Sequence, residues 1–539
     1  MINAQTSAPS QSPAGTLVAG RTEADRPGRP TRRGVPSGWP LLPVLVVQAL
    51  LSLRLLGADT AFQDEGLNLW AGHLQWANWL HGTAIPPFPY YFSGAPVIYP
   101  PLGALADHAG GLAGARALSL VFMLGATTLL WSAARRPYGR RAAFFAAALF
   151  AVLGPTLHLG AFATFDAPSL FLVALASWCV LRAGDQGAVM GHMVAAGGAL
   201  ALANATSYST VLFDVLVLVL AGLAAFPAPG ARVALQRVGI LLATVVVCLA
   251  VGLLIGGGSY LHGFTRTLLT PVAHTDSALS VLSSTWYWAG ILVVLAVGGV
   301  IISAVRRQGR AGTWLLAVLA AAAILGPAEQ AWLHTAALLN EHVGVGAWFA
   351  AIAAGYAADR FAVAVPPGRE QALTSAACVV ALAFPVYLGA AQSWAFATSW
   401  PNATAFIAVL RPLAGQGSGR LLVEDPSVAE YYLPSGREWR RWSSTRNITL
   451  PSGASTGNAA ATSGILAAGD AGTFTNYIAH GYFAYVALNF TDTTALDHGL
   501  ATELHRNPGY RTVSVVPYGT EVKPVGLGTY VIWKYEPHR

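Results

Sequence analysis

The sequence has little charge for its length. Asp, Glu, Lys and Arg together make up 10% of the 539 residues, whereas hydrophobic residues make up 54%. The mean hydropathy is +0.52, and runs of Ala, Val and Leu recur along the chain. This composition argues against a water-soluble globular class and predicts a polytopic membrane protein.

Lysine and cysteine are scarcer still. The only lysines are Lys523 and Lys534, so arginine carries almost the whole net charge of +7. The arginines gather in short segments between apolar runs, which the positive-inside rule explains better than nucleic-acid binding does. The three cysteines, Cys179, Cys248 and Cys378, each lie inside an apolar run without metal-ligand spacing. Neither a disulfide framework nor a cysteine metal site is therefore expected. The preference for arginine and alanine indicates a bacterium with a GC-rich genome.

Residues 1–38 contain almost no large apolar side chain and consist mainly of Pro, Gly, Ser, Thr and Arg. We expect a disordered, basic cytoplasmic tail. The tail has no short apolar stretch followed by a small-residue cleavage site, so a removable signal peptide is not expected.

Apolar segments dominate residues 39–398, and we expect about eleven of them to cross the bilayer. They are predicted at 39–57, 112–134, 142–159, 168–183, 190–206, 208–226, 238–256, 285–304, 313–329, 343–358 and 372–394. If these spans alternate, the arginine-rich connections all fall on the side of the basic tail. The N-terminus is therefore predicted to be cytoplasmic, and an odd number of spans places the C-terminus outside the cytoplasmic membrane.

The first predicted outer loop, 58–111, is too long for a simple connection and contains neither lysine nor arginine. It carries the adjacent acids Asp64 and Glu65 at the edge of an apolar slab, where burial of an unpaired carboxylate is costly. They form either a solvated acidic turn or a catalytic group that faces a membrane-embedded substrate. Apolar and aromatic residues between Leu69 and Leu80 recur at helical spacing, which predicts an amphipathic helix in the membrane interface.

Residues 399–539 differ in composition, with frequent Gly, Ser, Thr, Asn and Asp. Short strand-like runs alternate with helical patterns, and no nucleophile elbow, phosphate loop or zinc motif occurs among them. The strands are predicted at 421–423, 485–488, 512–516 and 530–533, and the helices near 427–433 and 495–506. We expect an extracytoplasmic α/β domain of ordinary size.

Further polar residues lie on the predicted outer face. Asp166 occupies a tight connection between two spans, where it is either functional or the N-cap of the helix that Pro168 opens. Arg116 and Arg266 stand near the outer ends of spans, where an arginine either reaches the lipid headgroups or binds a phosphate. His342 lies close to Glu341 at the start of another span.

Three of these segments together resemble the GT-C superfamily of membrane glycosyltransferases. They are Asp64-Glu65, Tyr99-Pro100-Pro101 and Phe165-Asp166-Ala167-Pro168. The similarity is to glycosyltransferase family 39, which includes protein mannosyltransferases and lipid A aminoarabinose transferases, and it covers about residues 40–360. Asn340-Glu341-His342, with the Gly-rich stretch that follows it, also resembles a segment of this family.

The resemblance implies a polytopic α-helical fold of the GT-C type and an inverting transferase. Such an enzyme takes a sugar from a polyprenyl-phosphate donor in the lipid bilayer and passes it to an extracytoplasmic acceptor, either a cell-envelope glycan, a lipid or a protein. The transition state has oxocarbenium character, and the leaving group is a phosphate. No nucleic acid takes part.

The resemblance also implies roles for individual residues. Asp64 is the expected general base, while Glu65 and Asp166 orient the acceptor or a cation. Relatives often have a lysine after the fifth span, which this chain lacks. Phosphate binding then falls more heavily on Arg116 or Arg266. Tyr99, Glu341 and His342 are further expected substrate- or phosphate-binding residues.

Some alternatives stay open. The sequence does not decide whether a divalent metal ion is needed; if one binds, Asp64 and Asp166 are its expected ligands. A transporter or flippase for a lipid-linked sugar is the second candidate, although no internal repeat supports it. A non-catalytic envelope scaffold is the third.

Overall fold

The computed structural model describes residues 41–90, 92–183, 189–224, 230–269, 276–306, 309–336, 339–363, 370–397, 399–415, 419–449, 465–467, 471–518 and 528–536. The chain divides into two units, Met1–Trp39 and Pro40–Arg539, and every described residue belongs to the second. The disordered tail predicted for residues 1–38 thus lies outside the described residues.

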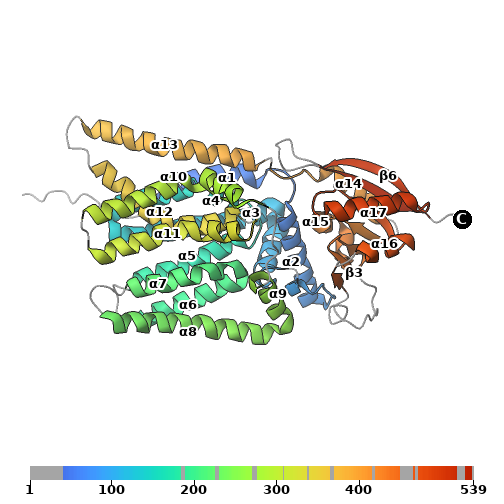
Figure 1. Ribbon diagram of the computed structural model, residues 1–539, viewed down its shortest axis with the longest axis horizontal. Helices are drawn as coiled ribbons and strands as arrows, with labels where there is room; N and C mark the ends of the chain where they lie inside the picture. The colour runs from blue at the N-terminus through green and yellow to red at the C-terminus, as the bar shows by residue number, and fades with distance from the viewer. Residues whose placement is uncertain are drawn as a thin grey trace, which may run out of the picture. The chain divides into compact units, whose positions relative to one another are not determined.

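Helices make up the first and larger part of the second unit (Figure 1). The α-helices are α1 (Leu42–Leu56), α2 (Gln63–His81), α3 (Tyr99–Ala151), α4 (Gly154–Leu159), α5 (Asp166–Arg182), α6 (Val189–Thr206), α7 (Asp214–Leu223), α8 (Gly230–Gly256), α9 (Gly258–Leu269), α10 (Ala278–Val305), α11 (Arg310–Trp332), α12 (Leu339–Val363) and α13 (Glu370–Phe396). Two 3₁₀ helices, η2 (Phe88–Tyr90) and η3 (Tyr208–Phe213), join them.

The predicted spans coincide with these helices, as expected for a multi-pass membrane protein. Among the described residues, five helices are long and apolar enough to cross a membrane, judged by length and composition alone: α3, α6, α8, α10 and α11. The span predicted at 142–159 is interrupted, because the chain leaves α3 at Val152 and begins α4 at Gly154.

Two glycines divide α3. Gly111 has φ +62° and Gly139 has φ +88°, values in the left-handed region that side chains with a Cβ atom rarely adopt. The helix therefore bends at both positions. The bends separate a short N-terminal piece in the first loop from two longer pieces, which match the predicted spans at 112–134 and 142–159.

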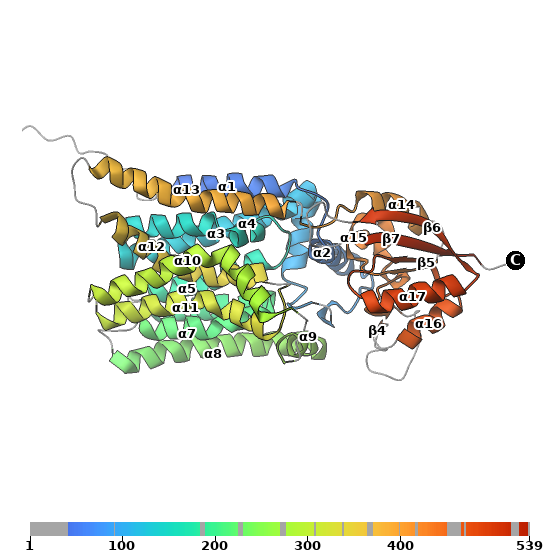
Figure 2. The same ribbon diagram turned by 45° about the horizontal axis from the view of Figure 1, so that its top comes forward.

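Helix α12 lies against both α10 and α11, as the two ribbon views show (Figure 2). Its Trp348, Phe349 and Tyr356 side chains are fully buried. A Cβ atom on Gly346 would lie 2.5 Å from the carbonyl oxygen of Ala322, so only glycine permits this approach to α11. The Gly-rich stretch after His342 is thereby explained as a close helix contact.

Helix α2 is helical, as predicted. Leu69, Trp70 and Leu74 are buried against α3 and the C-terminal part of the chain, whereas Trp79 and Leu80 near its C-terminal end are exposed. The location of α2 in a membrane interface stays a prediction. Gly72 packs directly on the backbone of Pro100, where a Cβ atom would lie 2.0 Å from its carbonyl oxygen. A buried helix and an interfacial helix share the same apolar periodicity, so the sequence pattern alone does not separate them.

The C-terminal part is an α/β structure, as predicted. Its α-helices are α14 (Thr404–Gly415), α15 (Ser427–Tyr432), α16 (Ala471–Ala479) and α17 (Thr494–Arg506), with 3₁₀ helices η4 (Pro434–Arg437) and η5 (Trp439–Arg441). Its strands are β1 (Arg420–Val423), β2 (Trp442–Ser443), β3 (Asn447–Thr449), β4 (Ile465–Ala467), β5 (Phe483–Leu488), β6 (Tyr510–Tyr518) and β7 (Gly528–Tyr535). All four predicted strands and both predicted helices are present, while α14, α16 and the short strands were not predicted.

The main sheet has the order β2-β1-β5-β7-β6, in which β1 runs parallel to β2 and β5. Successive residues of a strand point to opposite faces. Leu421 and Val423 pack with α14 and α15, whereas Leu422 packs with α16 and α17. The sheet is therefore covered by helices on both faces (Figure 2).

Polar contacts join the C-terminal part to the first loop. Asp107 accepts a hydrogen bond from the Tyr431 hydroxyl (2.7 Å) and lies 2.6 Å from Nε2 of His73. The Trp70 indole donates to the carbonyl oxygen of Gly436 (2.9 Å). These bonds fix the middle of α2 relative to α15 and η4.

Candidate active site

The acidic pair lies in the first turn of α2, not in the loop before it. The helix begins at Gln63, with Phe62 as the N-cap residue. Glu65 occupies the third helical position, and its Oε2 accepts a hydrogen bond from the Phe62 amide (2.9 Å). This is one half of a capping box, and carboxylates in a first helical turn also interact favourably with the helix dipole.

Glu65 is completely buried and fully hydrogen-bonded. Its carboxylate accepts from Nε of Arg116 (2.8 Å), Nη2 of Arg116 (2.7 Å) and the Ala163 amide (2.8 Å), in addition to the Phe62 amide. Four bonds occupy the lone pairs that a carboxylate offers. No acceptor position is left for a substrate or a cation, so the geometry does not support the predicted orienting role of Glu65.

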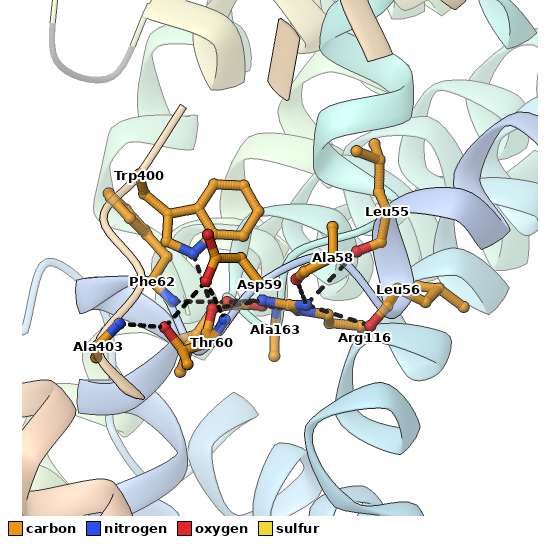
Figure 3. A network of polar contacts seen from close by, with 12 residues as sticks. Leu55, Leu56, Ala58, Asp59, Thr60, Phe62, Arg116, Ala163, Trp400 and Ala403 are labelled. Carbon is orange, nitrogen blue, oxygen red and sulfur yellow. Dashed lines mark hydrogen bonds and ion pairs between the residues drawn. The ribbon is translucent and has the colours of Figure 1, made fainter. Parts of the chain in front are cut away.

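Arg116 is 1% exposed and is bound on every nitrogen (Figure 3). Besides Glu65, it donates to the carbonyl oxygens of Ala58 (2.6 Å), Thr60 (3.1 Å) and Leu56 (3.2 Å). The guanidinium therefore ties the end of α1 to the start of α2. Its donors are used within the protein, so the geometry gives no support to the predicted phosphate site at Arg116.

Asp64, next to Glu65, has the opposite surroundings. It is partly exposed, and its carboxylate accepts no hydrogen bond from the described part of the chain. Burial within the protein raises the pKa of Asp64 to about 7, and the negative charges of Asp166, Asp425 and Glu65 act in the same direction. A carboxylate with this pKa is a suitable proton acceptor near neutral pH.

Two other acids lie close to Asp64. Asp166 interacts electrostatically with it, and Glu341 interacts with both. Asp166 is the first residue of α5, and Phe165 is the N-cap residue. The alternative interpretation of Asp166 as the N-cap is therefore wrong. Glu341 lies in the first turn of α12. The N-terminal turns of three helices thus converge, and each brings one partly exposed carboxylate.

His342 is held by a carboxylate that the sequence did not single out for a role. Its Nδ1 lies 2.7 Å from Oε2 of Glu329, near the end of α11, and 3.2 Å from Nε2 of Gln330. The shorter contact assigns the proton of neutral His342 to Nδ1. The buried Nε2 has no hydrogen-bond partner among the described residues, and the ring interacts electrostatically with Asp166.

The remaining predicted residues are placed as follows. Tyr99 lies at the start of α3, is 1% exposed and packs its ring on Gly103. It also interacts electrostatically with Glu65. Arg266 belongs to α9, but its side chain lies outside the described part of the structure. Among the described residues, no three Asp, Glu, His or Cys side chains lie close enough together to hold a metal ion.

Asp425 and Gln63 belong to the same region and were missed. Asp425 accepts a hydrogen bond from the Gln63 amide group and from the Ser427 amide (2.8 Å). Asp425 follows β1, and the carboxyl ends of parallel strands are the usual ligand edge of an α/β sheet. The predicted strand at 421–423 was therefore the available signal.

Three comparisons bear on the identity of this site. A family model described as dolichyl-phosphate-mannose-protein mannosyltransferase matches residues 108–256. No curated protein sequence gives a significant match. Among solved structures, ArnT from Cupriavidus metallidurans bound to undecaprenyl phosphate has a TM-score of 0.57 at 17% identity and covers 93% of this chain and 98% of its own.

The archaeal oligosaccharyltransferase AglB from Archaeoglobus fulgidus is also similar. Its complex with an inhibitory peptide and a dolichol-phosphate has a TM-score of 0.54 at 16% identity, and the match covers 91% of this chain and 75% of AglB. Both neighbours are glycosyltransferases, and the chain shares their GT-C fold. The predicted resemblance to GT-C glycosyltransferases is therefore confirmed.

Proposed function

We propose that this chain is an integral-membrane glycosyltransferase that moves a sugar from a polyprenyl-phosphate donor to an extracytoplasmic acceptor. The fold supports the class of enzyme, and the two similar structures contain a polyprenyl or dolichol phosphate. The observation that carries the proposal is the contrast within the first turn of α2. All acceptor positions of Glu65 are used in structural hydrogen bonds, whereas the carboxylate of Asp64 has no hydrogen-bond partner among the described residues and lies near Asp166 and Glu341.

Asp64 serves as the general base. It takes the proton from the attacking hydroxyl group of the acceptor as a bond forms between that oxygen and the anomeric carbon of the sugar. The bond between the anomeric carbon and the phosphate oxygen breaks, and the polyprenyl phosphate leaves with the electron pair. Attack on the face opposite the leaving group inverts the anomeric centre.

The departing phosphate needs positive charge or hydrogen-bond donors rather than a general acid. Because Arg116 is occupied, the groups available among the described residues include Arg446, whose charge acts on Asp64, and the N-terminal turns of α5 and α12, which favour anions. His342 supplies a further donor in its imidazolium form, in which Glu329 accepts from Nδ1–H and Nε2–H is left for the phosphate. Glu329 acts here as a positioning residue.

This arrangement requires the site to lie at the outer end of the helical bundle. The lipid tail of the donor stays in the bilayer, so its sugar is presented at the interface. We accordingly keep the predicted topology, with a cytoplasmic N-terminus and an extracytoplasmic C-terminal part. The arginine-rich end supports it: Arg141, beside the Gly139 bend, pairs with Asp359 of α12 (3.0 Å).

The test is transfer by the purified full chain in lipid nanodiscs. Radiolabelled polyprenyl-phosphate sugars are offered together with envelope glycans, lipids and peptides, and the products are separated from the donor. Transfer that requires Asp64 supports the proposal. Movement of the labelled donor across the bilayer of sealed proteoliposomes, without transfer, would instead establish the flippase. If no donor is turned over or moved, the non-catalytic scaffold is the candidate that remains.

A further inference from the structure

A cavity of about 330 Å³ lies between the first loop and the ligand edge of the C-terminal sheet. Ala61, Phe62 and Gln63 line one side, immediately before Asp64. Residues that follow β1 and β5 line the other side. Ligand sites typically measure about 300–1,000 Å³, so the cavity has room for a small polar ligand.

The sheet side of the cavity is rigidly built. Glu424, at the end of β1, is 2% exposed and accepts hydrogen bonds from four successive amides, those of residues 489–492, at 2.6–2.8 Å. These bonds hold Phe490 at φ +65°, a conformation that non-glycine residues rarely adopt. The turn after β5 thus presents Asn489, Thr491 and Asp492 to the cavity in a fixed arrangement.

The lining combines carboxylates with aromatic rings. Asp425 and Asp492 contribute negative charge, of which the exposed Arg446 offsets a part, because its Nη2 lies 3.5 Å from Oδ2 of Asp492. None of the described lining residues is itself Lys, Arg or His. Tyr518 and Tyr530 form an aromatic wall, with Tyr530 stacked on Phe406 at 3.9 Å. Trp400 is fixed by the bond from its indole to the carbonyl oxygen of Thr60 (2.8 Å). Aromatic faces with a few convergent hydrogen-bonding groups suit a sugar, and the carboxylates disfavour an anion.

The cavity is joined to the reacting centre through Gln63. Its side-chain amide binds Asp425, and the next residue in the first turn of α2 is Asp64. Asp166 and Glu341 approach Asp64 from the membrane helices. Asp64 therefore lies between the cavity and the region assigned to the donor.

We propose that this cavity binds the acceptor, and that the acceptor is a sugar unit that is neutral or carries an amine, not one that carries a phosphate or carboxylate. This inference rests on the proposed function, because it assigns the second substrate of that reaction. It makes the C-terminal part of the chain a substrate-binding element rather than a cover over the membrane helices.

The experiment measures binding of three probes to the purified full chain in detergent, without any donor. The probes are the methyl glycosides of glucose, glucosamine and glucuronic acid. Saturation-transfer NMR detects their binding, and titration gives the dissociation constants. We expect the glucose and glucosamine glycosides to bind at least about tenfold more tightly than the glucuronide. A difference of this size corresponds to the free energy of one hydrogen bond to a charged group.

Two variants test the location. Asp492→Asn should weaken binding of the glucosamine glycoside by about tenfold and bring the affinity for the glucuronide closer to that for the glucose glycoside. Unfolding would not produce this pattern, because it would weaken all three probes. Tyr518→Ala should weaken the glucose and glucosamine glycosides together. The matched control is Glu503→Gln, which removes a carboxylate that pairs with Arg506 on α17, away from the cavity lining.

Equal binding of all three probes, or binding that neither variant changes, would overturn the proposal. So would an acceptor found to be phosphorylated at the reacting sugar. Failure of the proposed function gives a different pattern, in which the glycosides bind as expected but no lipid-linked donor is turned over with them or with any other acceptor.

Discussion

The two sides of the first turn of α2 differ more than their sequence suggests. Glu65 faces the helical bundle, where it is fully buried and accepts four hydrogen bonds. Asp64 keeps partial exposure and accepts none from the described residues. An acidic pair can thus divide its work: the carboxylate of Glu65 holds the site together, and the carboxylate of Asp64 is the one that we propose for chemistry.

The division has a physical cause. A buried carboxylate is tolerated only when its charge is paired and its lone pairs are bonded, and Arg116 with two amides meets that condition for Glu65. Burial disfavours the ionised form of Asp64, and the neighbouring acids disfavour it further, while Arg446 opposes them in part. Structural carboxylates are stabilised as anions, whereas a base for neutral pH requires the opposite environment.

The largest expected effect is loss of turnover in Asp64→Asn. The amide keeps the volume of the side chain but cannot accept the proton, so kcat should fall by about 10²–10⁴. Melting temperature and expression should change little, because no hydrogen bond of the described structure is lost. Transfer in nanodiscs and thermal unfolding measure the two quantities.

Asp59→Asn is the control for this variant. Asp59 lies in the loop just before α2 with φ +47°, a conformation that asparagine tolerates. Its Oδ1 accepts hydrogen bonds from the Thr60 amide and from the side-chain amide of Asn402, and the carbonyl oxygen of an asparagine can accept the same bonds. Its replacement should retain most of the activity. Near-normal transfer by Asp64→Asn at normal expression would refute the assignment of the base.

Glu65→Gln and Arg116→Met should act on stability instead. Each leaves one buried charge without its partner, which typically destabilises a protein by about 3–5 kcal/mol. Both variants are therefore expected to express poorly or to unfold at lower temperature. Since each removes the same pair, the double variant should be less destabilised than the sum of the two. Strictly additive effects would show that the pair is not coupled.

Glu329→Gln should have an intermediate effect on catalysis. The amide oxygen can still accept from Nδ1–H, but it lacks the negative charge that stabilises a positive His342. Transfer should therefore fall by about tenfold, the equivalent of about 1.4 kcal/mol for a lost charge-assisted interaction. The transfer rate of His342→Phe should fall at least as far. Adding Glu329→Gln to that variant should reduce the rate little further. Independent losses from the two changes would contradict a joint role, and KM for the donor shows whether binding is affected.

Much of the fold was predictable because the bilayer dictates it. Helices that cross hydrocarbon must satisfy their own backbone hydrogen bonds, so apolar runs located the spans. Short strand-like runs located β1, β5, β6 and β7. Asp64 and Asp166 were found because acids are conspicuous in such a chain. The use of Arg116 was not predictable, since its partners are carbonyl groups about sixty residues away, which no sequence motif marks.

The cavity beside Asp425 escaped prediction for a related reason. It requires the first loop to meet the ligand edge of a sheet that begins more than 350 residues later. The periodicity of the sequence predicted that α2 has an apolar face, but it did not predict which part of the chain covers that face. Tertiary contacts between distant segments therefore decide which polar residues act together.

The smallest and most discriminating effect concerns pH. Asp64 must be ionised to act as a base, and its pKa is raised to about 7, mainly by burial and further by neighbouring acids. The value of kcat/KM should therefore rise with pH through about 7, because protonation inactivates the enzyme below that point. Asp425→Asn removes one negative charge near Asp64, which lowers the pKa of Asp64 and moves the acidic limb to lower pH. Glu503→Gln, on the far helix α17, should leave the limb where it is. A profile without an acidic limb, or one that both variants shift alike, would show that the titrating base is not Asp64 in the environment that the structure gives it.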